Sequence, residues 1–453
     1  MIKSFALKNE DLESNIFPNF YLFKQKIKSF SERKDITSFS LGDNGVLETL
    51  TDGEHAGQKF VSSGALFIKN SSVKRYGISE FDDFYITHEK NNLLKRSKLK
   101  KDDILLTTIG YYLGVSALVN SNVTEGNINQ NVVRIRVNSK FTTPQYLSCF
   151  LNSKLIRFQI DNLFSGTYPI LTYPKIKSLK IFLKNKKIEQ QVTDNIIKAE
   201  EFHLRALKLI KDAKKIFIDS LNVDFSKIKS SNFFALQNED YNQERSMNPA
   251  FYYPLYINTM KEIEKNNECI RLGDVATCKK GDEVGSTNYK RYLDRKESDI
   301  PFIRTTDLIN YDIDLYPDFY IEKDIVKSFS QDLLPCDIIY SNDGKIGLTA
   351  MLTPSDNCII QSHLERIRCT SIDPYYLFIA LSTNEVGQTQ AKRFTVIQTT
   401  IPTIGNNLVD FRIPKSKYYS RIIELTKEAF RLKDERKKLI TDSRILIEKS
   451  LEL

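Results

Sequence analysis

The sequence has few of the residues that build metal sites, and they are scattered. Its 453 residues include six cysteines and four histidines, and no two cysteines form a CxxC pair. Structural zinc sites need four clustered ligands, usually arranged as close pairs. We therefore expect no structural metal, and we expect the cysteines to be reduced thiols.

Long apolar runs are also absent. No stretch of 18 apolar residues occurs, and the N-terminal MIKSFALKNEDLESN carries acidic residues where a signal peptide has an apolar core. The sequence therefore predicts a cytoplasmic protein without a membrane role.

Common catalytic motifs are missing too. The chain contains no GxxxxGK[ST], GxSxG or HExxH. The segment 247–251, MNPAF, superficially resembles the NPP[YF] loop of amino-methyltransferases, but it lacks the second proline and no Gly-rich cofactor loop precedes it. The segment 365–368, ERIR, lacks the second carboxylate and the lysine of a nuclease site. We predict no catalytic residue, cofactor site or metal site in this chain.

The composition is that of a folded, moderately basic protein. Hydrophobic residues make up 41% and aromatics 11%, which excludes general disorder. The length predicts two or three domains. The net charge of +9 is compatible with nucleic-acid binding, although many basic proteins bind none.

Two segments predict long helices. Residues 186–221 contain no Pro or Gly, and apolar residues recur at alternating steps of three and four, interrupted only by His203. This is the pattern of a coiled-coil seam; its positions are Val192, Ile196, Ala199, His203, Ala206, Ile210, Ala213 and Phe217. A second such segment spans about 418–453, with Ile422, Leu425, Ala429, Leu432, Leu439 and Leu446 on the seam.

The residues before each helix form a repeat. Five blocks recur in the same order at offsets of 230 to 235 residues, which indicates two copies of a whole domain plus helix. The pairs are 41–43 with 272–274, 66–68 with 301–303, 102–105 with 336–339, 143–147 with 373–377, and 167–173 with 399–405. Each copy mixes short strands with one internal helix. The predicted divisions are 1–184 (first domain with an N-terminal adaptor), 185–224 (first long helix), 225–269 (linker and short helix), 270–415 (second domain) and 416–453 (second long helix).

The loops of both copies are rich in side chains that contact DNA bases and phosphates. Any one of them has a structural alternative: His55 can cap a turn, and Arg304 can pair with Asp307. Their clustering in equivalent loops favours binding. The candidates are His55, Lys59, Lys69, Asn70, Ser71, Ser72, Lys74, Arg75, Tyr111 and Tyr112 in the first copy, and Lys279, Lys280, Asn288, Lys290, Arg291, Arg304, Thr305 and Thr306 in the second.

Several blocks of the sequence resemble the specificity subunits of type I restriction–modification systems. TDGEHAGQKFVSSGALFIKNSSV (51–73) resembles the opening of their target recognition domain, and 279–308 resembles another version of it. Glu189-Gln190 resembles the EQ that opens the family's long helix. The sequence lacks the usual Pro-Pro before that EQ, and the second helix has no EQ.

The resemblance implies an α+β fold with two repeated mixed α/β target recognition domains separated by two long antiparallel coiled-coil helices. It implies that each domain reads one half of an asymmetric DNA target, and that the helices fix the spacing and dock two methyltransferase subunits. S-adenosylmethionine would bind in those partners, and ATP and Mg in a restriction subunit, if one is present. The alternatives are a scaffold with paired binding domains and no role on DNA, and a self-contained methyltransferase or nuclease.

Overall fold

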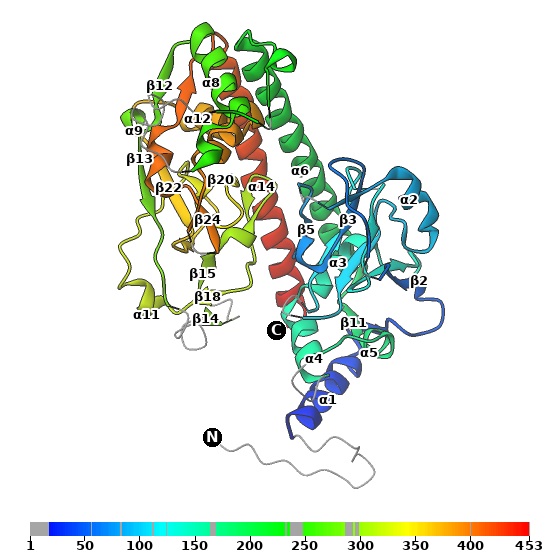
Figure 1. Cartoon of the computed structure of the whole chain (residues 1–453). Helices are drawn as coiled ribbons and strands as arrows, with labels where there is room; N and C mark the ends of the chain where they lie inside the picture. Colours follow the sequence, from blue (N-terminus) through cyan, green and yellow to red (C-terminus); the bar gives the residue numbers. More distant parts are fainter. Residues whose placement is uncertain are drawn as a thin grey trace. The chain divides into compact units, whose positions relative to one another are not determined.

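The chain folds into two units, and each of its two long helices contributes to both. The computed structural model describes residues 18–55, 57–81, 84–110, 113–123, 125–163, 169–231, 233–235, 248–285, 293–294, 299–398 and 400–452. The first unit comprises residues 1–198 and 439–453, and the second comprises residues 199–438 (Figure 1). The sequence-based divisions given above remain a prediction.

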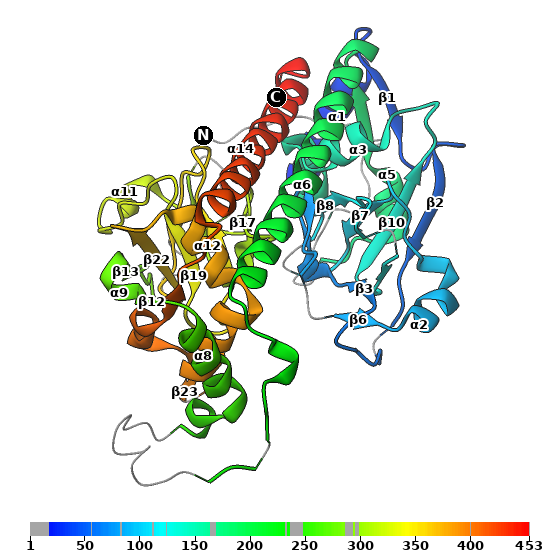
Figure 2. The same ribbon diagram turned by 90° about the horizontal axis from the view of Figure 1, so that it is seen from above.

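The first unit is built around an antiparallel sheet in the order β2-β10-β7-β8 (Figure 2). Its strands are β2 (Leu47–Asp52), β10 (Val132–Val137), β7 (Ile104–Thr107) and β8 (Ser116–Leu118). A second sheet contains β6 (Tyr85–Ile86), β3 (Ala65–Ile68) and β9 (Asn127–Ile128), with β3 and β9 parallel. Strands β3 and β7 are buried at every position, as expected of strands covered on both faces.

Helices complete the first unit. They are α1 (Pro18–Ser31), α2 (His88–Leu93), α3 (Pro144–Leu151), α4 (Lys154–Asn162) and α5 (Tyr173–Ser178). Helices α3 and α4 are separated at residues 152 and 153, because the Ser153 hydroxyl caps α4 and the Asn152 amide donates to the Ser116 carbonyl. Strand β1 (Thr37–Ser40) pairs with β11 (Lys180–Leu183), which leads into the long helix.

The second unit repeats this topology. Its main sheet has the order β13-β22-β19-β20, and β15 pairs antiparallel with β18 and parallel with β21. The strands are β12 (Cys269–Arg271), β13 (Ala276–Lys280), β14 (Leu293–Asp294), β15 (Ile300–Ile303), β16 (Leu308–Ile309), β17 (Asp312–Ile313), β18 (Tyr320–Ile321), β19 (Ile338–Ser341), β20 (Thr349–Met351), β21 (Ile359–Ile360), β22 (Leu364–Cys369), β23 (Val396–Gln398), β24 (Ile401–Thr403) and β25 (Arg412–Pro414). Its helices are α8 (Pro254–Asn266), α9 (Leu272–Val275), α11 (Lys323–Val326), α12 (Pro374–Ser382) and α13 (Thr389–Phe394).

The repeat extends to single hydrogen bonds and backbone angles. The hydroxyl of Tyr146 donates to the Phe182 carbonyl at 2.7 Å, and that of Tyr376 donates to the Pro414 carbonyl at 2.7 Å. Asp102 and Cys336, in the turns before β7 and β19, have φ angles of 67° and 72°, a left-handed conformation that non-Gly residues seldom adopt. The predicted duplication of a mixed α/β domain is therefore confirmed.

The first long helix, α6, spans Lys186–Ser220. All eight predicted seam positions are buried, and His203 is the most exposed of them at 8%. Those from Ala206 to Phe217 join the core of the second unit. The expected amphipathic helix is confirmed.

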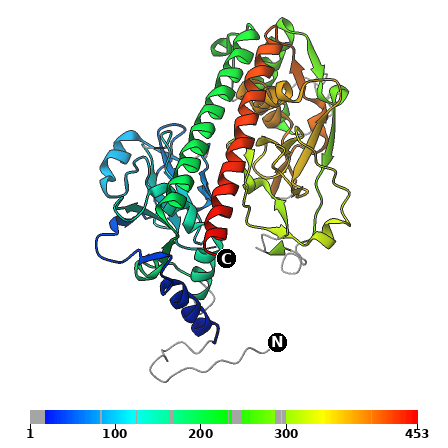
Figure 3. The ribbon, with the colours of Figure 1, turned by 180° about the vertical axis from the view of Figure 1, so that it is seen from behind.

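The second long helix, α14, spans Tyr419–Ser450. Within the second unit α6 and α14 run antiparallel, because Phe217 and Tyr419 both contact the Tyr376 ring while Arg205, earlier in α6, pairs with Glu428, later in α14 (Figure 3). In the first unit, the Glu448 carboxylate accepts a hydrogen bond from the Lys154 backbone nitrogen at the start of α4.

The predicted seam of α14 is only partly correct. Ile422, Leu425, Ala429 and Leu432 are buried, whereas Leu439 and Leu446 are only half-buried. The buried stripe continues through Lys433, Lys437, Ile440, Ser443 and Ile447 instead. Two lysines lie on it because carboxylates of the second unit neutralise both: Asp312 lies near Lys433 and Lys437, and Asp356 pairs with Lys437.

Candidate nucleic-acid interface

In both units, three loops meet at one end of the main sheet. They follow β2 and β7 and precede β10 in the first unit, and follow β13 and β19 and precede β22 in the second. Glu54 forms a parallel bridge with Asn129, and Asp282 forms one with Gln361. We call these the loop ends of the two units.

Glycines allow these loops to meet. A Cβ on Gly53 would lie 1.9 Å from the Ile128 carbonyl oxygen, and one on Gly281 would lie 2.3 Å from the Ile360 carbonyl oxygen. Neither position can accept a side chain without backbone movement. Gly110 and Gly344 both have φ of +78°, which favours glycine because other residues are strained there.

A fourth segment joins each loop end. Ile170 bridges Ile109 in the first unit, and Thr403 bridges Asp343 in the second. This equivalence pairs Pro169 with Pro402. The pairing of 167–173 with 399–405 inferred from the sequence is therefore displaced by one residue from the register that these two bridges give.

The candidates of the first unit differ in accessibility. His55, Lys59 and Ser71 are exposed, Asn70 and Arg75 are half-buried, and Ser72 and Lys74 are buried. The Lys69 ammonium lies 3.3 Å from the centre of the Phe84 ring, a cation–π contact. Residues 70–72 form the turn η2 (Asn70–Ser72), and Lys74 lies in the hairpin β4 (Val73–Lys74) and β5 (Gly77–Ile78). Tyr111 and Tyr112 lie outside the described residues.

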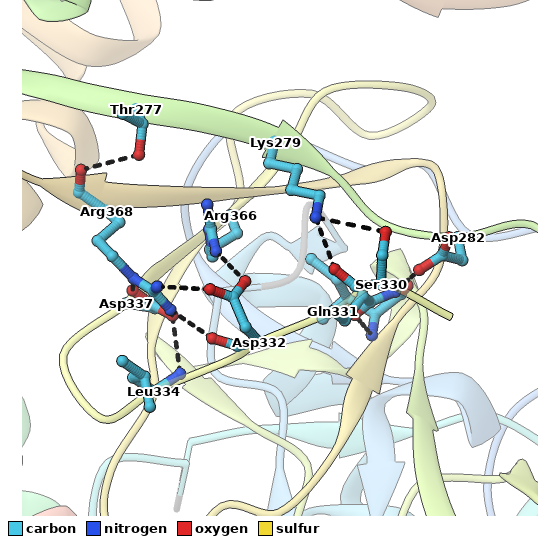
Figure 4. A network of polar contacts seen from close by, with 11 residues as sticks. Thr277, Lys279, Asp282, Ser330, Gln331, Asp332, Leu334, Asp337, Arg366 and Arg368 are labelled. Atoms are coloured by element: carbon cyan, nitrogen blue, oxygen red, sulfur yellow. Dashed lines mark hydrogen bonds and ion pairs between the residues drawn. The ribbon is translucent and has the colours of Figure 1, made fainter. Parts of the chain in front are cut away.

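The candidates of the second unit include several with structural partners. The exposed Lys279 donates to the Ser330 carbonyl at 2.6 Å (Figure 4), and Lys280, also exposed, lies 3.5 Å from an Asp343 carboxylate oxygen. Arg304 contacts Asp307, Asp318 and the Phe319 ring. Thr305 is half-buried and Thr306 is exposed in the turn η7 (Thr305–Asp307). Asn288, Lys290 and Arg291 lie outside the described residues.

A basic segment of the first unit was missed by the sequence interpretation. It consists of Lys95, Arg96, Lys98, Lys100 and Lys101, all exposed except the half-buried Lys98, and we call it the basic segment. Arg96 reaches the loop end, where it pairs with Asp52 at 2.6 Å. Lys98 offers its carbonyl oxygen to Arg134 on β10. The run KRSKLKK (95–101) is the sequence pattern that could have predicted this basic surface.

The second unit has a carboxylate at the corresponding place. Asp332 occupies the position of Lys98, and its carboxylate accepts hydrogen bonds from Arg366 and Arg368 on β22 (Figure 4). The Arg368 guanidinium holds the pKa of Asp332 below its usual range. Asp337 accepts from Arg368 at 2.7 Å. At the position of the basic segment, the second unit therefore has carboxylates that balance its arginines, whereas the first unit presents cations.

The two loop ends also differ in charge. In the second unit, the His363 ring nitrogen Nδ1 lies 3.1 Å from Asp343, and the Asn342 amide donates to Glu365 at 2.6 Å. Burial opposes ionisation of Asp343, but hydrogen bonds from Thr403 and His363 hold its pKa below the usual range. Burial raises the pKa of Glu365 to about 7. The equivalents of Asp343, His363 and Glu365 in the first unit are the uncharged Ile109, Asn131 and Val133.

The described part of the segment 247–251, residues 248–251, has a structural role. The Asn248 side chain caps the turn η5 (Pro249–Tyr252) by accepting from the Ala250 nitrogen, and its amide donates to the Thr395 carbonyl. Phe251 is buried. Among the residues that the structure describes, no three His, Cys, Asp or Glu side chains are grouped to hold a metal ion, and no helix has the length and apolar character needed to cross a membrane.

Comparisons with known proteins give remote structural matches. The S subunit of a type I restriction–modification system from M. genitalium is 13% identical, with 92% of this chain and 95% of that chain covered and a TM-score of 0.32. The HsdS subunit from Thermoanaerobacter tengcongensis is 16% identical, with 92% and 97% covered and a TM-score of 0.28. A chain from a study of type I restriction–modification complex assembly is 15% identical, with 93% and 97% covered and a TM-score of 0.27.

The sequence itself matches no family model and no curated protein. The three structures come from the same kind of system that the sequence resembles. Because their TM-scores are low, we base the function on this chain's own residues.

Proposed function

We propose that this chain is the DNA sequence-specificity subunit of a type I restriction–modification complex. The observation that carries the proposal is the duplication: one chain holds the same domain twice, each copy with its own loop end and its own long helix. A chain built in this way suits a target with two separated parts.

The chemistry of the loop ends and of the basic segment favours DNA as the ligand. Lysine, arginine, hydroxyl and amide side chains contact phosphates and base edges in nucleic-acid complexes. His55, Lys59 and Arg96 of the first unit and Lys280 and Thr306 of the second lie in or beside the loops that meet there. Double-stranded DNA is the partner that uses all of them.

The differences between the loop ends favour an asymmetric target. In the second unit the Asp343 carboxylate lies 3.1 Å from the His363 ring, whereas the equivalent residues of the first unit are Ile109 and Asn131. Two domains with one fold and different contacting side chains read different half-sites. Linking them in one chain makes the second binding event intramolecular, which increases affinity.

The long helices set the distance between the half-sites and dock two methyltransferase subunits. In this proposal the chain itself catalyses nothing. S-adenosylmethionine binds in the methyltransferase partners, and ATP and Mg in a restriction subunit where one joins the complex.

Mapping adenine methylation tests the proposal. The methyltransferase gene is expressed in cells with and without this chain, and the methylated adenines are sequenced. We expect methylation at one bipartite sequence only when the chain is present. Asp343→Ala with His363→Ala should change one half-site and leave the other intact. A methylation pattern that does not depend on the chain would contradict the proposal.

A further inference from the structure

The second unit carries an exposed apolar hairpin at its loop end. Strand β23 (Val396–Gln398) pairs with β24 (Ile401–Thr403), with Ile397 opposite Pro402 and Gln398 opposite Ile401. Ile397 is 76% exposed, which is unusual for a large aliphatic side chain because its exposed surface costs free energy in water.

The two faces of this hairpin are not equivalent. Directly opposed residues share a face of a β-ribbon, so Ile397 and Pro402 lie on one face and Val396, Ile401 and Thr403 on the other. Thr403 is 7% exposed and Val396 is half-buried, so this end of their face packs on the unit, whereas Ile401 is 45% exposed. The face of Ile397 is open.

The base of the hairpin is held firmly. The Gly344 backbone nitrogen donates to the Pro402 carbonyl at 2.9 Å, and the Thr395 hydroxyl donates to the Ala391 carbonyl at 2.6 Å. The hairpin also joins the loop of Asp343 through the bridge to Thr403. Because these bonds fix the foot of the hairpin, its open face keeps one orientation. Binding then loses little conformational entropy in ordering the hairpin.

The shape and surroundings of the hairpin fit the major groove of DNA. That groove accepts a two-stranded β-ribbon, and the thymine methyl is the apolar group that its base pairs present there. The flanking Lys345 and Lys392 are exposed cations, which suit a polyanion. An isoleucine has no polar atom, so it can distinguish bases only through apolar contact.

We propose that the open face of the β23–β24 hairpin lies in the major groove and that Ile397 reads a thymine methyl group in the half-site of the second unit. This inference rests on the proposed function and adds a specificity-determining residue to it. Ile401, which is 45% exposed on the opposite face of the same hairpin, points away from that base in this proposal.

Uracil substitution tests this proposal. The complex of the full chain with its methyltransferase subunits is titrated with its target duplex, and each thymine of both half-sites is replaced in turn by uracil, which lacks only the methyl group. We expect one thymine of one half-site to give about a fourfold loss of affinity, the effect of one buried methyl group. Ile397→Ala should bind the thymine duplex more weakly and give equal affinities for thymine and uracil.

Ile401→Ala is the matched control, because it truncates the same residue type on the same hairpin. It should retain the fourfold difference, and the thermal midpoints of both variants should match that of the wild type. Equal affinities for thymine and uracil in the wild type, or an unchanged difference in Ile397→Ala, would overturn the proposal. So would weaker assembly with the methyltransferase subunits in Ile397→Ala at unchanged DNA affinity. A wild-type complex that binds no specific DNA would instead overturn the proposed function.

Discussion

The ammonium group of Lys437 lies 2.6 Å from a carboxylate oxygen of Asp312, inside the second unit. It also lies 2.7 Å from Asp356, and its side chain is 1% exposed. Burial alone would lower the pKa of Lys437, but the two carboxylates outweigh it and raise that pKa, so the lysine stays charged. This cluster attaches α14 to loops that are far away in the sequence.

Removing the Lys437 charge should destabilise the second unit. Lys437→Met leaves the buried Asp356 without its cation and Asp312 with the more distant Lys433, 3.7 Å away. Breaking a buried pair in this way costs about 3–5 kcal/mol. Lys427→Met, on an exposed position of α14, should cost little. Urea unfolding followed by circular dichroism measures both variants. Equal losses in the free energy of unfolding in the two variants would show that the cluster does not stabilise the packing of α14.

The Lys437 cluster also explains why the buried face of α14 was only partly predictable from the sequence. Apolar spacing was sufficient for α6, whose predicted seam is buried from Val192 to Phe217. For α14 the same rule chose Leu439 and Leu446, because it does not allow for a lysine neutralised by aspartates from distant loops. A pattern of local spacing carries no information on such partners.

The candidate site was also predictable only in part, because local sequence carries no information on distant partners. Loop composition and the repeat located the loop ends, and Lys280 and His55 lie there. Burial of Lys74 and the contact of Arg304 with Asp318 depend on tertiary packing, whereas the local pairing of Arg304 with Asp307 was an alternative that the sequence already offered. The hairpin of Ile397 was missed because apolar residues in a sequence are assigned to the core by default.

Glu365 should make the stability of the second unit depend on pH. Its pKa of about 7 in the folded protein exceeds the value of about 4.3 for an exposed glutamate. The fold therefore favours the protonated form, whose stabilising effect is complete below about pH 4.3 and is lost as the pH rises through 7. We expect Glu365→Gln to be more stable than the wild type at pH 8 by up to about 4 kcal/mol, because a pKa difference of one corresponds to about 1.4 kcal/mol.

Urea unfolding at pH 4, 6 and 8 measures this difference. The difference in the free energy of unfolding between Glu365→Gln and the wild type should increase between pH 4 and 8. Glu424→Gln, at a side chain that is 68% exposed, is the control and should follow the wild type throughout. Parallel curves for Glu365→Gln and the wild type would show that burial does not perturb this carboxyl.

The basic segment should contribute to the salt dependence of DNA binding. Each lysine–phosphate contact adds about 0.9 to the slope of log K against log salt concentration. Replacing Lys95, Lys98, Lys100 and Lys101 by glutamine should lower that slope by up to about 3.6, with the target sequence unchanged. Replacing Lys323, on α11, and Lys327, directly after it, is the control, because both are exposed in the second unit. A slope that falls equally in both variants would argue against a specific role for the segment.

The long helices should act as a ruler between the half-sites. Both cross from one unit to the other, α6 between Lys198 and Ala199 and α14 between Lys438 and Leu439. Four residues inserted into each helix at these points add about 6 Å of helix, which corresponds to about two base pairs of DNA.

Methylation mapping reads the result directly. We expect the spacer between the half-sites to lengthen by about two base pairs while both half-sites keep their sequences, because the loop ends are unchanged. The same four residues inserted between Ser230 and Ser231, in the exposed linker, should leave the spacer as it was. Altered half-sites with an unaltered spacer would show that the helices do not set the distance.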